Sequence, residues 1–208
     1  QYIYDNLMNK EIILINKYKK LINAELEIRL RSVDKEIFIN LLSKLLEFGD
    51  KYTIEYSIDT ILESLDNKKL IRKQIFLSDG SKTSDIYINK IRIMDIFKTG
   101  YFNYKISLSQ EIPKQFINID SNVLLRYKFR ITFIKFDWKI DMTLIKQKNV
   151  YTIKTSEYDK ISNDIKQIKK EFFIPIMNND NLLDKLNNIH NLVDKYEIEM
   201  EYIGVQSE

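Results

Sequence analysis

The chain has 208 residues, of which 33 are Lys or Arg and 30 are Asp or Glu, giving a net charge of +3. A hydrophobic content of 44% is enough for one folded core and excludes a disordered or collagen-like chain. The absence of cysteine excludes a disulfide scaffold, a thiolate zinc site and a cysteine nucleophile. The only histidine, His190, stands among apolar and amide residues, which argues against a Ser-His-Asp triad and against His-ligated metals. Any catalysis would therefore rely on carboxylates and cations.

The small net charge means that attraction of a charged ligand has to come from local placement of charges. No apolar run approaches the ~20 residues of a membrane span, and the first residues lack the pattern of a signal peptide. The sequence begins at Gln1 rather than at Met. We therefore expect a cytoplasmic domain, without a membrane partner, that forms part of a longer protein.

Helical and strand periodicities alternate along the first half of the chain. The first twenty residues predict a helix with Met8, Ile12, Ile15 and Lys19 on one face. A second helix is expected from a cap at Asp34 to a stop at Gly49. Period-two alternation rich in Ile, Tyr, Phe and Thr predicts strands at Ala24–Arg31, Lys51–Ser57, Leu70–Leu77, Asp85–Met94 and Asn103–Glu111.

The second half begins with further strands and ends with helices and one more strand. Strands are predicted at Leu124–Lys135, Trp138–Lys146 and Val150–Thr155, with a tight hairpin at Phe136-Asp137. Helices are predicted from Ser156 to Pro175 and from Leu182 to Val193, separated by an Asn-rich loop at 178–181, and a last strand covers Tyr196–Ile203. Many strands joined by short turns favour an α+β fold in which a closed antiparallel β-barrel of about eight strands is flanked by helices. We see no domain boundary, so residues 1–208 are expected to form a single domain.

Carboxylates occupy one face of the first and last predicted strands. Glu197, Glu199 and Glu201 alternate with apolar residues, so the three carboxylates follow one another about 7 Å apart along the strand. The first strand repeats this pattern with Glu25 and Glu27, which Arg29 and Arg31 continue on the same face.

A row of cations complements these carboxylates. Arg126, Lys128 and Arg130 share one strand face, and all six arginines of the chain fall in predicted strands, where bidentate geometry toward carboxylate or phosphate is useful. Further polar candidates for the same interior are Lys105, Ser107, Ser109, Glu111, Asp141 and Thr143. One such strand is ordinarily a solvated sheet face, but the same alternation on five strands favours a barrel with a polar interior.

Four ordered motifs resemble the triphosphate tunnel metalloenzymes, and among them the RNA 5′-triphosphatases of viral and fungal mRNA capping, especially those of large DNA viruses of the mimivirus type. The motifs are Glu25-Leu-Glu27-Ile-Arg29, Arg126-Tyr-Lys128-Phe-Arg130, Trp138-Lys-Ile-Asp141-Met-Thr143 and Glu197-Ile-Glu199-Met-Glu201. The resemblance spans nearly the whole chain, from Glu25 to Glu201.

The resemblance implies a set of site residues. Glu25, Glu27, Glu199 and Glu201 would hold Mg²⁺ or Mn²⁺ through hard oxygen ligands, with Glu197 at the edge of the cluster. The cation strand Arg126, Lys128 and Arg130 would clamp the phosphates. Arg72 or its neighbour Lys73, and Lys90 or Arg92, would supply further cations, and Glu111 and Asp141 would position basic residues or the attacking water.

The resemblance also implies a reaction and partners. It predicts hydrolysis of the γ-phosphate at the 5′-triphosphate end of RNA, without a covalent intermediate, and guanylyltransferase and methyltransferase domains in the same full-length chain. A viral protein of this kind would be found in the virion or in the viral factory of the host cell. We expect the surface to lack a basic-aromatic patch, so that the RNA body is bound weakly and free NTP is also hydrolysed. Three alternatives remain open: a hydrolase of inorganic polyphosphate or thiamine triphosphate, a cyclase, and a non-catalytic barrel that binds polyphosphate or a protein.

Overall fold

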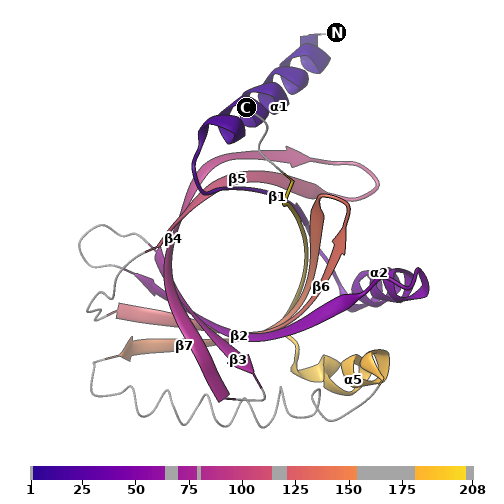
Figure 1. The fold of residues 1–208 in the computed structure, drawn as a ribbon, viewed down its shortest axis with the longest axis vertical. Helices are drawn as coiled ribbons and strands as arrows, with labels where there is room; N and C mark the ends of the chain where they lie inside the picture. The colour runs from indigo at the N-terminus through magenta and orange to yellow at the C-terminus, as the bar shows by residue number, and fades with distance from the viewer. Residues whose placement is uncertain (1, 64–69, 79–80, 114–120, 154–180, 205–208) are drawn as a thin grey trace.

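Eight antiparallel strands close into a ring in the computed structural model, which describes residues 2–63, 70–78, 81–113, 121–153 and 181–204 (Figure 1). The order around the ring is β1-β5-β4-β3-β2-β6-β7-β8, and β1 closes it by pairing with both β5 and β8. The strands are β1 (Ala24–Leu30), β2 (Tyr52–Glu63), β3 (Leu70–Ser78), β4 (Ser81–Lys98), β5 (Tyr104–Pro113), β6 (Ser121–Lys135), β7 (Trp138–Ile153) and β8 (Lys195–Tyr202). The described helices are α1 (Tyr2–Lys20), α2 (Lys35–Glu47), α5 (Leu182–Ile189) and the short 3₁₀ helix η3 (His190–Leu192).

The predicted antiparallel, strand-rich architecture with few helices is confirmed, and the strand boundaries differ most in β2, β4 and β7. β6 and β7 meet at the predicted turn, where Phe136 adopts a positive φ of 55°. The predicted break between Lys146 and Val150 is wrong, because pairing of β7 with β6 continues through Asn149 and the polar side chains there do not interrupt the backbone ladder. β2 and β4 are longer than predicted, because pairing of β2 with β3 continues to Glu63 and the ladders of β4 run from Ser81 to Lys98. The helix predicted between Ser156 and Pro175 lies outside the described residues.

The helix α2 forms as its sequence predicts and covers one outer side of the barrel. The Asp34 side chain accepts a hydrogen bond of 2.8 Å from the Ile37 amide, and Gly49 takes the positive φ of 70° that ends the helix. Its apolar face buries Phe38, Leu42 and Leu45. These side chains join a core cluster that β2, β6, β7, β8 and α5 share, namely Ile58, Leu125, Tyr127, Phe129, Ile131, Phe133, Met142, Leu144, Leu182, Leu186, Ile189 and Ile198.

The helix α1 packs through a different face from the predicted one. Leu14 and Tyr18 are the buried ones among the side chains that the structure describes in this helix, and they form a second cluster with Ile96 and Leu108. Ile12 and Ile15, which the sequence places on the buried face, are 52% and 47% exposed. The helix is apolar on more than one side, so its periodicity alone did not identify the face that meets the barrel. Among the described residues, no helix combines the length and the apolar character needed to cross a membrane.

The odd and even residues of a strand go to opposite sides of this barrel. On β6, Tyr127, Phe129, Ile131 and Phe133 point outward into the apolar cluster that α2 and α5 cover. Their neighbours Arg126, Lys128 and Arg130 point inward. The apolar faces therefore lie outside and the charged faces converge inside, as the strand patterns predict.

Candidate active site

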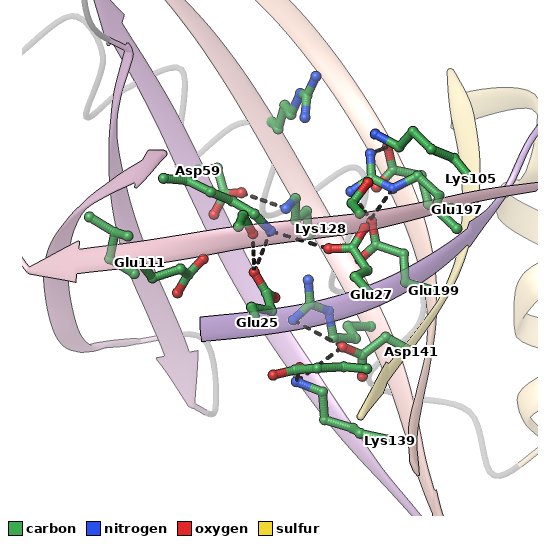
Figure 2. A pocket seen from close by; sticks show the side chains of 18 of the residues that line it. Glu25, Glu27, Asp59, Lys105, Glu111, Lys128, Lys139, Asp141, Glu197 and Glu199 are labelled. Carbon is green, nitrogen blue, oxygen red and sulfur yellow. Dashed lines mark hydrogen bonds and ion pairs between the residues drawn. The ribbon is translucent and has the colours of Figure 1, made fainter. Parts of the chain in front are cut away.

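The barrel encloses a cavity of about 620 Å³, and Ile88 is the one apolar residue among the described residues that line it. Figure 2 shows carboxylate and ammonium groups pointing into one shared space from several strands. The lining residues are Glu25, Glu27, Arg29, Glu55, Asp59, Ile88, Lys90, Arg92, Lys105, Ser107, Ser109, Glu111, Arg126, Lys128, Arg130, Lys139, Asp141, Glu197, Glu199 and Glu201.

The two carboxylate rows lie side by side because β1 and β8 are paired strands. The antiparallel register places Glu27 opposite Glu201 and Arg29 opposite Glu199. Directly opposed residues on a sheet have Cβ atoms about 5 Å apart. The pairing thus brings the first and last motifs of the chain into one cluster, although more than 160 residues separate them.

Arg29 lies within this cluster and contacts three of its carboxylates. Its Nε is 3.1 Å from Oε1 of Glu27, one of its terminal nitrogens is 3.8 Å from Oε1 of Glu197, and the other contacts Glu199. Burial opposes the charge on the Arg29 guanidinium, but the surrounding carboxylates outweigh this and raise its pKa. For Glu199 the balance is reversed: burial, together with repulsion from Glu27 and Glu197, raises its pKa despite the contact with Arg29.

Two lysines compensate the remaining carboxylates. The Nζ of Lys90 is 2.5 Å from Glu25 and 3.2 Å from Glu27. The Nζ of Lys139 contacts Glu201 and lies 3.5 Å from Asp141. Burial lowers the pKa of a lysine, yet in both lysines the neighbouring carboxylates dominate and the pKa is raised. Both lysines are therefore cations at neutral pH.

The cation strand β6 presents three side chains in three different environments. Lys128 pairs with Asp59 at 2.5 Å, and both side chains are almost fully buried. Arg130 lies 3.5 Å from Asp141, whose other oxygen accepts a 2.7 Å hydrogen bond from Thr132. Arg126 has no ion-pair partner within the described ranges, and its buried Nε has no hydrogen-bond partner there. Arg126 is therefore a cavity cation that no carboxylate in the described part of the chain neutralises.

The structure brings together all but one of the predicted site residues. Glu111 and Asp141 line the cavity, and so do both Lys90 and Arg92, between which the sequence left the choice open. Ser109 donates a 3.2 Å hydrogen bond to Glu25. The exception is Arg72: its Cα pairs with that of Ile88, a lining residue, but its side chain and that of Lys73 lie outside the described residues. His190 is remote from the cavity, with its Nδ1 2.7 Å from the Asn187 carbonyl oxygen.

Three charged lining residues were not predicted from the sequence: Glu55, Asp59 and Lys139. Asp59 lies beyond the predicted end of its strand at Ser57, so the row that it forms with Glu55 was cut in two. Both residues alternate with the large apolar residues Tyr56 and Ile58, and this pattern could have predicted that the strand continues to Asp59. Lys139 stands two residues before Asp141, and this spacing places it on the same strand face.

The donor set fits a hard divalent ion in its chemistry. The cavity offers several carboxylates and no softer ligand, which is the set that Mg²⁺ and Mn²⁺ prefer. Within the described residues, no three acidic side chains are grouped closely enough to hold one ion, because Arg29, Lys90 and Lys139 are paired with the predicted ligands. Binding of an ion would have to exchange some of these ion pairs for metal contacts.

Acid is expected to weaken the fold through Glu197. Burial raises the pKa of this carboxyl, but Arg29 and Lys195 outweigh burial and lower it below the ordinary value of 4.5. A carboxyl with a lowered pKa in the folded state stabilises the fold above pH 4.5, and this stability is lost as the pH falls through the folded-state value. In metal-free buffer, the urea midpoint of E197Q should therefore fall less steeply below pH 4.5 than that of the wild type. Equal pH dependence of the urea midpoint in the wild type and in E197Q would contradict the role of Glu197. The control is E47Q, at an exposed residue of α2.

Comparison with known proteins gives relatives in sequence and in structure. No protein-family model matches the chain. It is 28% identical over 207 residues to mRNA-capping enzymes of African swine fever virus, from a Kenyan pig isolate and from the Badajoz strain, covering 92% of this chain and 22% of each relative. The chain thus spans about a fifth of the length of these curated relatives.

Solved structures agree with the fold. The RNA triphosphatase domain of the trifunctional mimivirus mRNA capping enzyme matches with a TM-score of 0.61 at 16% identity, covering 94% of this chain and 87% of that one. The RNA triphosphatase of S. pombe matches with a TM-score of 0.57 at 16% identity, covering 96% and 79%. The chain is therefore a distant homologue of a viral mRNA-capping enzyme, and its fold is that of the RNA triphosphatases of mimivirus and S. pombe.

Proposed function

We propose that this chain is a metal-dependent RNA 5′-triphosphatase, which removes the γ-phosphate from the 5′ end of nascent mRNA in the first step of capping. One observation carries the proposal: within a barrel of the triphosphatase fold, two adjacent carboxylate rows and a strand of cations face a single cavity. Such a cavity can hold both a polyanion and the ion that neutralises it.

The cations of the cavity provide the binding of the triphosphate. A 5′-triphosphate carries about four negative charges, and several guanidinium and ammonium groups that face one cavity can bind it strongly. Arg126 is the cation with no carboxylate partner in the described part of the chain, so it is available to a phosphate without breaking an ion pair. Lys128 and Arg130 extend the same row, and Arg72 is the proposed contribution of β3.

The carboxylate rows would hold the metal. Glu25 and Glu27 on β1 and Glu199 and Glu201 on β8 are the proposed ligands, with Glu197 at the edge of the cluster. When bound, a divalent ion would neutralise the charge that develops on the phosphate oxygens during transfer. Arg29 contacts two of these rows, which suits it to keep the unliganded carboxylates together.

The remaining carboxylates divide into two roles. Asp141 has both oxygens engaged, with Thr132 on one and Arg130 and Lys139 on the other, so we assign it to positioning Arg130. Glu111 is the proposed group that orients the attacking water and takes its proton. The water oxygen forms a bond to the γ-phosphorus, and the bond from that phosphorus to the β,γ-bridging oxygen breaks. The products are a 5′-diphosphate RNA end and inorganic phosphate.

The span of the match suggests a larger protein. Because the chain corresponds to 22% of its capping-enzyme relatives, we propose that residues 1–208 form one domain of a longer capping enzyme. Guanylyltransferase and methyltransferase domains would accompany it in that enzyme.

The ion pairs favour a second candidate, a barrel that binds polyphosphate without hydrolysing it. Each proposed metal ligand already has a cation partner: Lys90 for Glu25, Arg29 for Glu27 and Glu199, and Lys139 for Glu201. If these pairs were purely structural, the barrel would need no metal. Hydrolysis therefore decides between the two candidates.

The test is release of phosphate from γ-labelled triphosphate-ended RNA, with Mg²⁺, with Mn²⁺ and with chelator. ATP and inorganic tripolyphosphate are assayed beside the RNA. We expect metal-dependent release from the RNA and slower release from the free triphosphates. Tripolyphosphate as the preferred substrate would instead identify a small-molecule hydrolase. Binding of tripolyphosphate without any release by folded protein would identify a binding barrel.

A further inference from the structure

The two ends of the barrel differ in charge and in the residues around them. At one end, β1 ends beside the start of β5 and the end of β4, since Leu30 and Lys98 both pair with Tyr104. At the opposite end, β1 begins where β8 finishes, next to the β6–β7 turn: the Ile203 amide donates to the Asp137 carbonyl oxygen at 2.8 Å. The β4–β5 turn and the β6–β7 turn therefore mark opposite mouths of the cavity.

The inward rows become cationic toward the β4–β5 mouth. On β1 the row runs from Glu25 and Glu27 to Arg29, and Arg31 follows directly after the strand. The neighbouring strands contribute Lys105 from the start of β5 and Arg92 from β4, which line the cavity and share one carboxylate partner, Asp95, at 3.9 Å and 3.2 Å. Toward the other mouth, the lining groups are mainly acidic, namely Glu25, Glu55, Glu111, Asp141 and Glu201, with Arg130 and Lys139 among them.

An exposed cluster of one cation and three aromatic rings stands at the cationic mouth. Phe97 pairs with Lys105 across the β4–β5 ladder, so both side chains share the inward face at the rim. The guanidinium of Arg31 lies over the Phe97 ring, 5.2 Å from its centroid. The exposed fractions are 57% for Phe97, 96% for Tyr101 and 50% for Phe102, although rings of this size are normally buried.

The cluster is held in place by the fold. The Arg31 amide donates a 2.8 Å hydrogen bond to the Asn103 carbonyl oxygen, which ties the end of β1 to the β4–β5 turn. In that turn Tyr101 and Phe102 are in edge contact, with ring centroids 4.9 Å apart. Exposed rings beside a fixed cation are the features with which proteins bind single-stranded RNA: bases stack on the rings and the cation meets a phosphate.

We propose that Arg31, Phe97, Tyr101 and Phe102, here named the rim cluster, bind the first nucleotides of the RNA. The inference rests on the proposed function, because it assumes that the triphosphate lies in the cavity. It also gives the substrate a direction: the γ-phosphate points toward the carboxylate rows, and the RNA body leaves through the β4–β5 mouth. The cationic mouth favours the polyanionic backbone, whereas the acidic mouth repels it.

The opposite mouth offers a matched control. Phe136, in the β6–β7 turn, is 89% exposed and has the same ring, but it lies at the acidic end of the cavity. The test compares Y101A, F97A and R31Q with F136A in the full chain. For each variant, binding of a fluorescent 5′-triphosphate RNA hexamer is measured by anisotropy. The rate of phosphate release is also measured at increasing concentrations of the hexamer and of inorganic tripolyphosphate, which gives a KM for each substrate.

Loss of one stacked base costs about 1–3 kcal/mol, which corresponds to roughly 5- to 150-fold in affinity. We therefore expect Y101A and F97A to weaken hexamer binding about tenfold and to raise the ratio of the hexamer KM to the tripolyphosphate KM by a similar factor. F136A should change neither the affinity for the hexamer nor the ratio of the two KM values. Unchanged hexamer binding in all three rim variants, or equal weakening by F136A, would overturn the proposal. Absence of phosphate release from either substrate would count against the proposed function, and the binding measurement would still decide whether the rim cluster contacts RNA.

Discussion

The E27Q variant is expected to lose metal-dependent phosphate release by at least about 10²-fold while remaining folded. Glu27 lies opposite Glu201 in the β1–β8 register and contacts both Arg29 and Lys90, so it occupies the centre of the proposed metal ligands. Glutamine keeps the size of the side chain and removes the anionic oxygens that a hard cation requires. Release from triphosphate-ended RNA, measured across a Mn²⁺ titration, reports the loss.

Two further observations make this result specific. E47Q removes a carboxylate from an exposed position of α2, outside the cavity, and should keep full activity. Manganese-dependent thermal stabilisation should be reduced in E27Q but not in E47Q, because binding of an ion to the folded state alone raises its stability. If E27Q were folded and hydrolysed the RNA at the rate of the wild type, the carboxylate rows would not be the metal site.

The K128M variant is expected to lose about 3–5 kcal/mol of unfolding free energy, because it leaves the carboxylate of Asp59 buried without its cation. Asp59 is 1% exposed and its oxygen lies 2.5 Å from the Nζ of Lys128. Urea unfolding followed by circular dichroism measures the effect. The double variant D59N/K128M should recover much of the loss, since neither member of the pair then carries an uncompensated charge.

Lys146 provides the matched control for this pair. Its Nζ lies 3.5 Å from Asp194, but both side chains are more than a third solvent-exposed. Exposed pairs contribute about 0–1 kcal/mol, so K146M should cost little. A K128M variant no less stable than K146M would show that Lys128 and Asp59 are not a buried structural pair, and Lys128 would then be free to serve the phosphate alone.

The sequence predicts the site residues correctly where charged side chains recur at every second position of one strand. Alternation alone places Glu25 with Glu27, Glu197 with Glu199, and Arg126 with Lys128, because every second residue of a strand shares a face. The inward direction of these faces follows from the large apolar residues between them, which need a helix-covered outer side. A barrel interior lined with charge was therefore predictable before the register was known.

Contacts between strands were beyond the sequence because they depend on register. The register of the β4–β5 ladder shifts between Arg92 and Met94, and this changes which β4 residues face inward. The alternation of residues along β4 does not predict the shift. The choice between Lys90 and Arg92 was unnecessary, since both side chains reach the cavity. That Arg29 pairs with Glu199 follows only from how β1 and β8 are aligned.

The rim cluster also depends on contacts between separate segments of the chain. Residues 97–105 combine four aromatic residues with Lys98 and Lys105, but the sequence does not show which of these side chains are exposed. The expectation that the surface lacks a basic-aromatic patch is wrong, because Phe97, Tyr101 and Phe102 are exposed in this segment. Pairing of β1 with β5 then adds Arg31 to these rings, which the sequence alone could not predict.

Product analysis of RNA hydrolysis in ¹⁸O-labelled water shows directly whether the chain transfers the γ-phosphoryl group to water. Triphosphate-ended RNA is incubated with the wild-type chain and Mn²⁺, and both products are analysed by mass spectrometry. Attack of water on the γ-phosphorus predicts inorganic phosphate that contains one ¹⁸O atom and an unlabelled RNA with a 5′-diphosphate end. Pyrophosphate with a 5′-monophosphate RNA end, or intact RNA after incubation with folded, metal-saturated protein, would contradict the account.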